Sequence, residues 1–435
     1  MHPASSSSSA PSAAADAARQ RASFFRQSGW LMIANIASGV LMWAVHLLNK
    51  AIPPGEYGSF GALLAVVMLL PTIPLQMVLA QQTAKAIAQG REREVAGVIH
   101  AVWLVITLVW VVGAALVLRY QQAILDHWKM TSPVGLWITL AIVLFSFWLP
   151  MFWGVLQGQQ NFLWLGWSML ANGIGRLTVA AVAVLALHAY ASGMMAGVLL
   201  GIMIGVGIAA GQTRRLWWLR AQAFDGRALV RQVLPLALGF LGFQILFTGD
   251  TILVKAWFSQ TDADFYVSAG TLSRALMWLV LPLASVMFPR IVHSAARAES
   301  SDLMGKVLLA TAVLAVVGAL GLSLLGPWVV RFVYQPEFVA VASSLLPWYA
   351  AAMVPLAVAN VLLNNLLARP AASFGPAVCI FALAIGYLAA LTRFHGQLVT
   401  VLQVLGVFNL ALLAVCAWFT WRQRQARPSA TSLPG

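Results

Sequence analysis

The stretch VAGVIHAVWLVITLVWVVGAALVL, residues 95–118, contains no Asp, Glu, Lys or Arg and is long enough to cross a lipid bilayer. A membrane-spanning helix needs about 20 apolar residues, because the hydrocarbon core is about 30 Å thick and a helix rises about 1.5 Å per residue. Eleven more apolar stretches of similar length fill the chain. They lie at 29–48, 59–80, 134–156, 162–187, 193–212, 232–256, 265–290, 303–325, 343–366, 373–391 and 397–420.

The composition predicts a membrane protein built only from helices. Hydrophobic residues make up 61% of the 435 residues and charged residues 9%, whereas soluble domains carry about 25% charged residues. Barrel strands would alternate apolar and polar residues over about 10 positions, and no such alternation runs through these stretches. Since only helices and closed barrels satisfy their backbone inside lipid, we expect an all-α, polytopic protein with twelve transmembrane helices.

The net charge of +14 reports topology rather than binding to nucleic acid. With the N-terminus placed in the cytoplasm, 18 Lys and Arg residues fall on inner segments. Six fall on outer segments: Lys50, Arg119, Lys129, Lys255, Arg331 and Arg393. Cytoplasmic loops carry the excess of basic residues in membrane proteins, so this distribution predicts that both termini are cytoplasmic. The basic residues would also attract anionic lipid headgroups.

The chain divides into two six-helix bundles. We expect a disordered cytoplasmic tail over 1–24, bundles over 25–212 and 232–421, and a basic cytoplasmic tail over 422–435. The intervening segment, 213–231, carries five arginines and one acid and is predicted to be a cytoplasmic linker that includes an amphipathic helix.

The two halves show a weak internal likeness. Glu56-Tyr57-Gly58 is followed by Pro74, as Asp264-Phe265-Tyr266 is followed by Pro282. An even number of helices in each half gives both halves the same orientation, as in parallel transporter repeats. Chance similarity between apolar hairpins is the alternative.

Three ionisable residues lie inside the predicted spans. At about 1.5 Å per residue, Arg176 is roughly 21 Å from the inner end of its helix, while Asp250 and Arg274 are roughly 9 and 14 Å from the outer ends of theirs. Charge at such depth is costly and usually faces a cavity or a partner. The depths favour an ion pair between Asp250 and Arg274. The pair is either structural or part of a cationic cavity for an anionic headgroup. In the second case Asp250 would pair with an arginine until substrate or a proton displaces one of the two partners.

Amide side chains within the spans offer further candidate contacts. Gln76 and Gln244 lie on the repeated helices and could bind sugar hydroxyls, although amides also join helices to each other. Cys379 and Cys416 lie inside predicted spans and indicate neither a disulfide nor a metal site. The sequence holds no Walker motif and no metal-binding His/Cys spacing, so we expect no enzymatic activity and no cofactor.

Several segments resemble the polysaccharide exporters, the Wzx-type O-antigen flippases of the multidrug/oligosaccharidyl-lipid/polysaccharide (MOP) superfamily. The segments are 28–31 (SGWL), 52–60 (IPPGEYGSF), 234–237 (LPLA) and 250–255 (DTILVK), together with Tyr266, Arg274, Pro282 and 287–290 (MFPR). The resemblance runs from about residue 25 to 421.

This resemblance implies a particular fold and function. It implies twelve helices around a central cavity, in the bacterial inner membrane. It also implies movement of an undecaprenyl-diphosphate-linked oligosaccharide between leaflets, with a coupling cation (H⁺ or Na⁺) and the polysaccharide polymerase machinery as partners. Arg176, Asp250 and Arg274 match positions where such proteins commonly carry charge. With Gln76 and Gln244 from the repeated helices, we expect Arg176 and Arg274 to bind substrate and Asp250 to act in coupling or as a charge partner. Another MOP exporter, for lipid II or drugs, and a non-transporting scaffold of envelope assembly are the alternatives.

Overall fold

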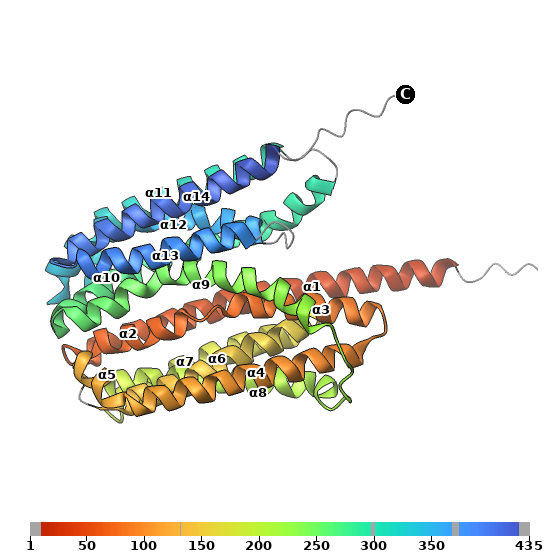
Figure 1. The fold of residues 1–435 in the computed structure, drawn as a ribbon, viewed down its shortest axis with the longest axis horizontal. Coiled ribbons are helices and arrows are strands. Elements are labelled where there is room, and N and C mark those ends of the chain that lie inside the picture. The colour runs from red at the N-terminus through yellow and green to blue at the C-terminus, as the bar shows by residue number, and fades with distance from the viewer. Residues whose placement is uncertain (1–9, 131, 297–300, 368–373, 426–435) are drawn as a thin grey trace, which may run out of the picture.

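A computed structural model describes residues 10–130, 132–296, 301–367 and 374–425. Within these ranges every regular element is a helix (Figure 1). The helices are α1 (Ala10–Ala44), the 3₁₀ helix η1 (Val45–Ala51), α2 (Glu56–Met68), α3 (Thr72–Ala88), α4 (Glu92–Arg119), α5 (Gln121–His127), α6 (Val134–Gly158), α7 (Phe162–Leu185), α8 (Tyr190–Trp217), α9 (Gly226–Trp257), α10 (Gln260–Ala296), α11 (Ser301–Val333), α12 (Phe338–Leu367), α13 (Phe374–Arg393) and α14 (Leu398–Gln425).

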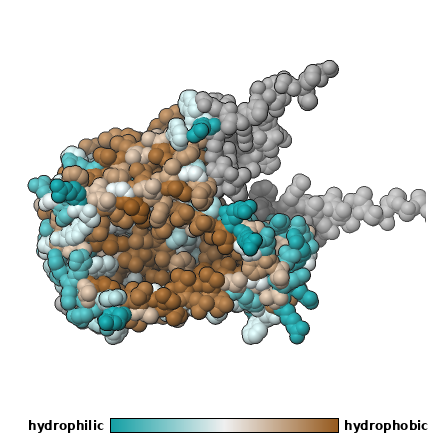
Figure 2. Space-filling view, viewed as in Figure 1, coloured by the Kyte–Doolittle hydropathy of each residue, from teal (hydrophilic) through white to brown (hydrophobic). Residues whose placement is uncertain are grey.

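The chain is a multi-pass membrane protein. Eleven segments of the described residues are long and apolar enough to cross a membrane, with α2 and α3 counted together, and α10 occupies the position of the remaining expected span. Large apolar side chains on α4, such as Leu104, Val105 and Val109, are more than half exposed. Figure 2 shows the result, a broad apolar band with hydrophilic residues at both ends of the long axis. Such a band is the surface that lipid covers.

The structure corrects three details of the sequence interpretation. α1 begins at Ala10, inside the tail expected to be disordered over 1–24, because residues 10–24 are rich in alanine, which has the highest helix propensity; residues 1–9 lie outside the described part. The expected linker over 213–231 contains no separate amphipathic helix. Instead α8 extends to Trp217 and α9 starts at Gly226, which leaves 218–225 as the connection.

The third correction concerns the expected span at 59–80, which is two helices rather than one. Pro71 and Pro74 have no backbone N–H, so neither can continue the helical hydrogen-bond pattern. The Thr72 N–H turns to the Leu70 carbonyl at 2.8 Å, so the Met68 carbonyl receives no bond from Thr72. The helix therefore ends at Met68 and restarts at Thr72.

The same helix pairs pack together in both halves of the chain. α1 packs on α7 as α9 packs on α13, α3 packs on α6 as α10 packs on α12, and α6 packs on α8 as α12 packs on α14. Figure 1 shows the two resulting bundles one above the other, with α9 next to α2 along their contact. The first bundle comprises α1 to α8 and the second comprises α9 to α14.

The two ends of the molecule differ. The short helix α5 and the starts of α2 and α10 lie at one end, which we call the α5 end, while the outermost parts of α1 and α14 lie at the other, the termini end (Figure 1). α2 contacts both α9 and α10 of the second bundle. η1 contacts α11 and α3 contacts α9 as well, so the bundles meet along η1, α2 and α3 of the first bundle.

Candidate functional site

Asp250 and Arg274 form the ion pair that their depths predict. The Arg274 Nη2 lies 2.9 and 3.0 Å from the two Asp250 carboxylate oxygens and 2.7 Å from the Thr251 hydroxyl. Its Nε donates to the Phe247 carbonyl at 2.8 Å. The Asp250 side chain is fully buried and that of Arg274 is 13% exposed. A buried charge is tolerated only when it is paired and hydrogen-bonded, and both conditions hold here.

Two tyrosines complete the surroundings of the Asp250 carboxylate. Tyr266 donates a hydrogen bond to it at 2.7 Å, and Tyr349 from α12 donates a second. The guanidinium of Arg274 lies over the rings of Tyr349 and Phe247, 5.3 and 5.7 Å from their centroids, an arrangement in which a cation is attracted to the ring faces. The cluster ties α9, α10 and α12 together and has no net charge.

Arg176 lies in the middle of α7 and in the other bundle. α7 and α8 approach closely there, because a side-chain carbon at Gly197 or Gly201 would lie 2.6 Å from the backbone carbonyl of Arg176 or Asn172. These two glycines belong to a series at every fourth position of α8, which also includes Gly193 and Gly205. Small residues with this spacing let membrane helices pack backbone to backbone. The glycine series therefore fixes the position of Arg176.

The charge of Arg176 has no acidic partner among the described residues. The residue is only 9% exposed, and its Nε makes no hydrogen bond. One turn earlier, the Asn172 side-chain oxygen is also buried without a partner. The helix η1, which carries His46, packs against α7. A buried cation without a counter-charge is costly, and it would attract an anion.

His46 belongs to a group of hydrogen-bonded side chains that joins the two bundles. Its Nδ1 lies 2.7 Å from the Tyr57 hydroxyl. That hydroxyl lies 3.2 Å from the hydroxyl of Tyr334 and 3.4 Å from that of Thr271, both in the second half of the chain. All three ring-bearing side chains are buried. His46, Tyr57 and Tyr334 thus form a line of buried side chains that joins η1 to the second bundle.

The two glutamines have different surroundings. Gln76 donates to the Gln157 side chain at 3.1 Å, within the first bundle and in an exposed position. Gln244 of α9 donates to the Met68 carbonyl at 2.5 Å, the group that the break between α2 and α3 leaves without a helical partner. Gln244 thus joins the two bundles at the break.

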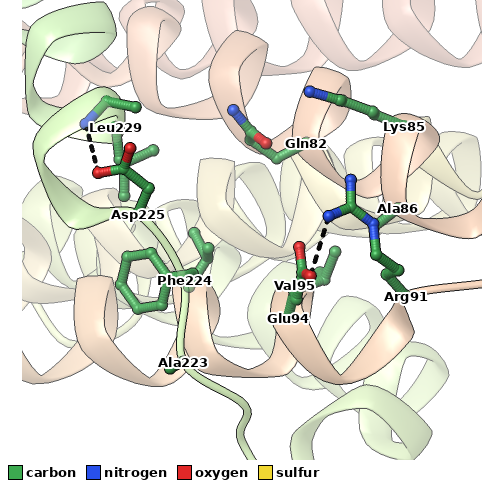
Figure 3. Close-up of a pocket in the computed structure, with 12 residues that line it drawn as sticks. Gln82, Lys85, Ala86, Arg91, Glu94, Val95, Ala223, Phe224, Asp225 and Leu229 are labelled. Carbon is green, nitrogen blue, oxygen red and sulfur yellow. Dashed lines mark hydrogen bonds and ion pairs between the residues drawn. The ribbon is translucent and has the colours of Figure 1, made fainter. Parts of the chain in front are cut away.

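A cavity of about 490 Å³ opens at the termini end and holds none of these residues. Figure 3 shows Arg91 paired with Glu94, with Lys85 on the same side of the cavity and Asp225 on the opposite side. Two basic and two acidic side chains line the cavity, so it lacks the excess positive charge that a diphosphate requires. Its remaining lining comes from α3, α4, the connection between α8 and α9, and the first turn of α9: Gln82, Ala86, Val95, Val98, Ala223, Phe224, Ala228 and Leu229.

Comparison with known proteins identifies a family and a fold for the chain. A family model described as "Polysaccharide biosynthesis protein" matches residues 24–295. No curated protein matches the chain. An inward-facing multidrug resistance MATE family transporter of the MOP superfamily is 13% identical, with a TM-score of 0.70, and covers 89% of this chain and 96% of that chain.

Two further solved structures agree. The lipid II flippase MurJ in an inward closed conformation is 12% identical, with a TM-score of 0.65, and covers 90% of this chain and 87% of that chain. A mutant of the Vibrio cholerae MATE transporter VcmN is 14% identical, with a TM-score of 0.53, and covers 93% of this chain and 99% of that chain. At these identities the likeness establishes the fold.

Proposed function

The chain belongs to the polysaccharide biosynthesis protein family, and from this we propose that it is a flippase for an undecaprenyl-diphosphate-linked oligosaccharide. It would carry the glycan from the inner to the outer leaflet of the bacterial inner membrane by alternating access, for assembly of surface polysaccharide such as O-antigen. The headgroup carries at least two negative charges and cannot cross about 30 Å of hydrocarbon unaided. The protein must therefore offer it fixed positive charge.

The observation that carries this proposal is the unpaired charge of Arg176 in the middle of a membrane helix. Arginine suits a phosphate group because its planar guanidinium donates two parallel hydrogen bonds. Arg176 is nearly buried, lacks an acid and leaves its Nε without a partner. A diphosphate would supply both the missing charge and the missing acceptor.

Arg274 takes a secondary role in this proposal. Its charge is already balanced by Asp250, so it can bind substrate only when the carboxylate lets it go. Asp250 would then act as the coupling group, released by substrate or by a proton. Gln244, at the junction of the bundles, would contact the glycan when the bundles separate, and Gln76, half-buried on α3, would contact it from the first bundle.

The proposed topology follows from the distribution of basic residues. The connection at 218–225, the tail at 422–435 and the N-terminus would be cytoplasmic, so the α5 end would face outward. The bundles over 25–212 and 232–421 would rock against each other. A coupling cation (H⁺ or Na⁺), surrounding lipids and the polysaccharide polymerase machinery would be the partners.

Depletion of the protein followed by extraction of lipid-linked glycans tests this function. We expect a lipid-diphosphate-linked oligosaccharide to accumulate on the inner leaflet. Proteoliposomes containing the purified protein should then move a fluorescent analogue of that lipid between leaflets, and the Arg176→Gln variant should not. Accumulation of lipid II would assign the protein to peptidoglycan assembly instead. Normal levels of all lipid-linked glycans, with loss of an assembly complex, would indicate a scaffold.

A further inference from the structure

The start of α2 is capped by a side chain from the other bundle. Gly55 and Gly58 donate their backbone N–H groups to the two Asp264 carboxylate oxygens, at 2.5 and 2.6 Å. No side chain of the first bundle caps this helix start. Asp264 lies on α10 and is 1% exposed. One carboxylate thus holds α2 against α10 at the α5 end, where the bundles meet.

The packing around this contact leaves no room for a side chain on the facing surface of α2. Gly55 has a φ of +91°, in the left-handed region that favours glycine. A side-chain carbon at Gly58 would lie 2.9 Å from an Asp264 oxygen, and one at Gly61 would lie 2.3 Å from Val267. α2 and α10 therefore touch along a glycine face. A small outward shift of either helix breaks both hydrogen bonds.

The two bonds are strongest when the carboxylate is ionised. An ionised carboxylate only accepts hydrogen bonds, so each oxygen can receive one N–H. Protonation converts one oxygen into an O–H donor that faces an N–H donor. One bond is then lost, and the bond that remains is no longer charge-assisted. The protonated form thus holds α2 less firmly than the ionised form.

Charged groups from three segments surround Asp264. Lys255 on α9 is 1% exposed, and its Nζ lies 3.5 Å from the Gly55 carbonyl. Lys255 and Glu56 both act electrostatically on Asp264, and Lys129 acts on Lys255 from the first bundle. Two acidic side chains, Asp264 and Glu56, thus act on the Lys255 ammonium at the start of α2. Protonation of Asp264 would leave Glu56 as the acid that acts on it.

Water is close to this buried pair. Lys129 donates to the Phe258 carbonyl at 2.6 Å, and Gln260 donates to the Lys129 carbonyl at 2.7 Å, in both cases at exposed positions. Gln260 also lies against Gly55, since a side-chain carbon there would be 2.7 Å from its Oε1. The exposed Gln260 thus lies beside Gly55, whose N–H bonds to the Asp264 carboxylate.

We propose that Asp264 is a proton-binding site, and that a proton bound there releases α2 from α10 so that the α5 end can open. The ionised form would hold the molecule closed at this end. Only the purpose of this opening rests on the proposed function; the proton-binding site itself does not. If the function is glycan transport, proton binding from the outside would select the outward-open state.

Distances between spin labels at the α5 end test this inference without substrate. Labels on Ala123→Cys in the first bundle and Glu337→Cys in the second would be introduced in a background lacking Cys379 and Cys416. Both labelled positions are exposed. In lipid nanodiscs we expect one short distance at neutral pH and a second, longer distance that grows as the pH falls.

Two variants and a matched control sharpen the test. Asp264→Asn imitates the protonated acid, and we expect it to raise the ratio of long to short distances about tenfold, as loss of a charge-assisted hydrogen bond predicts, and to make the ratio independent of pH. Gly58→Ala should also favour the long distance, because its methyl group displaces Asp264. Asp262→Asn, two residues away and bonded only to Ser259, should behave like the unsubstituted protein.

Two results would overturn the proposal. One is a distance distribution of the unsubstituted protein that does not change with pH. The other is a shift of the same size in Asp262→Asn as in Asp264→Asn. The unsubstituted protein needs no mutation for its pH titration, so poor folding of a variant cannot mask the answer. A transport assay that failed while the distances shifted would count against the proposed function and leave the proton site intact.

Discussion

The Nη2 atom of Arg274 lies 2.9 and 3.0 Å from the two carboxylate oxygens of Asp250, inside a cluster that also contains Tyr266 and Tyr349. The four side chains come from three helices of the second bundle. Because the carboxylate receives hydrogen bonds from three side chains, its removal leaves several groups without a partner at once. The pair therefore has measurable consequences for stability.

Asp250→Asn should destabilise the protein by about 3–5 kcal/mol, the usual cost of leaving one member of a buried pair uncompensated. Asp250→Asn combined with Arg274→Gln should recover part of that loss. Melting temperatures in detergent, read by size-exclusion fluorescence, give the comparison. Glu94→Gln is the control, since it breaks the exposed pair with Arg91 and should cost at most about 1 kcal/mol. Strictly additive losses in the double variant would show that the two side chains do not interact.

Arg176→Gln should abolish glycan export while the protein level stays normal, because the substitution removes the unpaired charge. Arg176→Lys should retain partial activity, since lysine keeps the charge but lacks the planar guanidinium. Surface polysaccharide, measured on gels against membrane protein level, provides the readout. Normal export by a variant carrying both Arg176→Gln and Arg274→Gln would contradict the role of arginine in substrate binding.

Gly201→Ala should destabilise the first bundle by about 1–3 kcal/mol, the range for overpacking a close contact. Its methyl group would lie 2.6 Å from the Asn172 carbonyl, which forces α7 and α8 apart and displaces Arg176. Gly207→Ala on the same helix is the matched control, because nothing lies within 4 Å of that position, and alanine favours a helix. Equal melting temperatures for the two variants would argue against the glycine contact.

Gln244→Leu should loosen the break between α2 and α3, because the Met68 carbonyl loses its donor. The net loss is about 1 kcal/mol for a typical hydrogen bond. Faster hydrogen exchange of the amides around residues 69–73 would reveal it. Gln76→Leu, which removes an exposed bond to Gln157, should leave that exchange unchanged; an equal effect of both variants would refute the bridging role of Gln244.

Cysteines at Ala221 and Ala123 test the proposed topology in a background lacking Cys379 and Cys416. Ala221 lies in the connection between α8 and α9, and Ala123 lies in α5; both are exposed. In intact cells an impermeant thiol reagent should label position 123 and spare position 221. The reverse labelling would invert the orientation.

The sequence predicted the second bundle's ion pair but not what surrounds it. Asp250 and Arg274 lie on consecutive spans at similar depth, and two opposite charges inside a membrane have a strong reason to pair. Their tyrosine partners could not be identified in this way, because Tyr349 comes from a helix about 100 residues later and hydroxyl groups carry no charge to mark them. The position of Tyr349 depends on how α12 packs.

Asp264 escaped the sequence analysis for a different reason. It lies close to the end of a predicted span, where a charged residue costs little free energy and therefore does not indicate a functional site. Its partners are backbone N–H groups, which every residue except proline carries. The glycines at 55 and 58 were the available signal, since a glycine-rich helix start offers exposed N–H groups, but only the fold shows that α10 supplies the acceptor.

The pattern of hydrophobicity also could not predict the break in the second span. The run at 59–80 is continuously apolar, and a proline in a membrane helix often produces only a kink. Two prolines three residues apart, Pro71 and Pro74, remove two donors from adjacent turns. Gln244 donates to the free carbonyl of Met68, and its proximity depends on the arrangement of the bundles.

The cap on α2 also constrains how the chain is made. Gly55 and Gly58 are separated from Asp264 by 209 and 206 residues. At about 5–20 residues per second, the ribosome needs about 10–40 seconds to cover that distance. Until then the first amides of α2 must remain bonded to water or to the insertion machinery. The first six spans thus cannot reach their final arrangement while the chain is half synthesised, and a nascent chain that stalls before α10 would present an unfinished helix end to the cell's quality control.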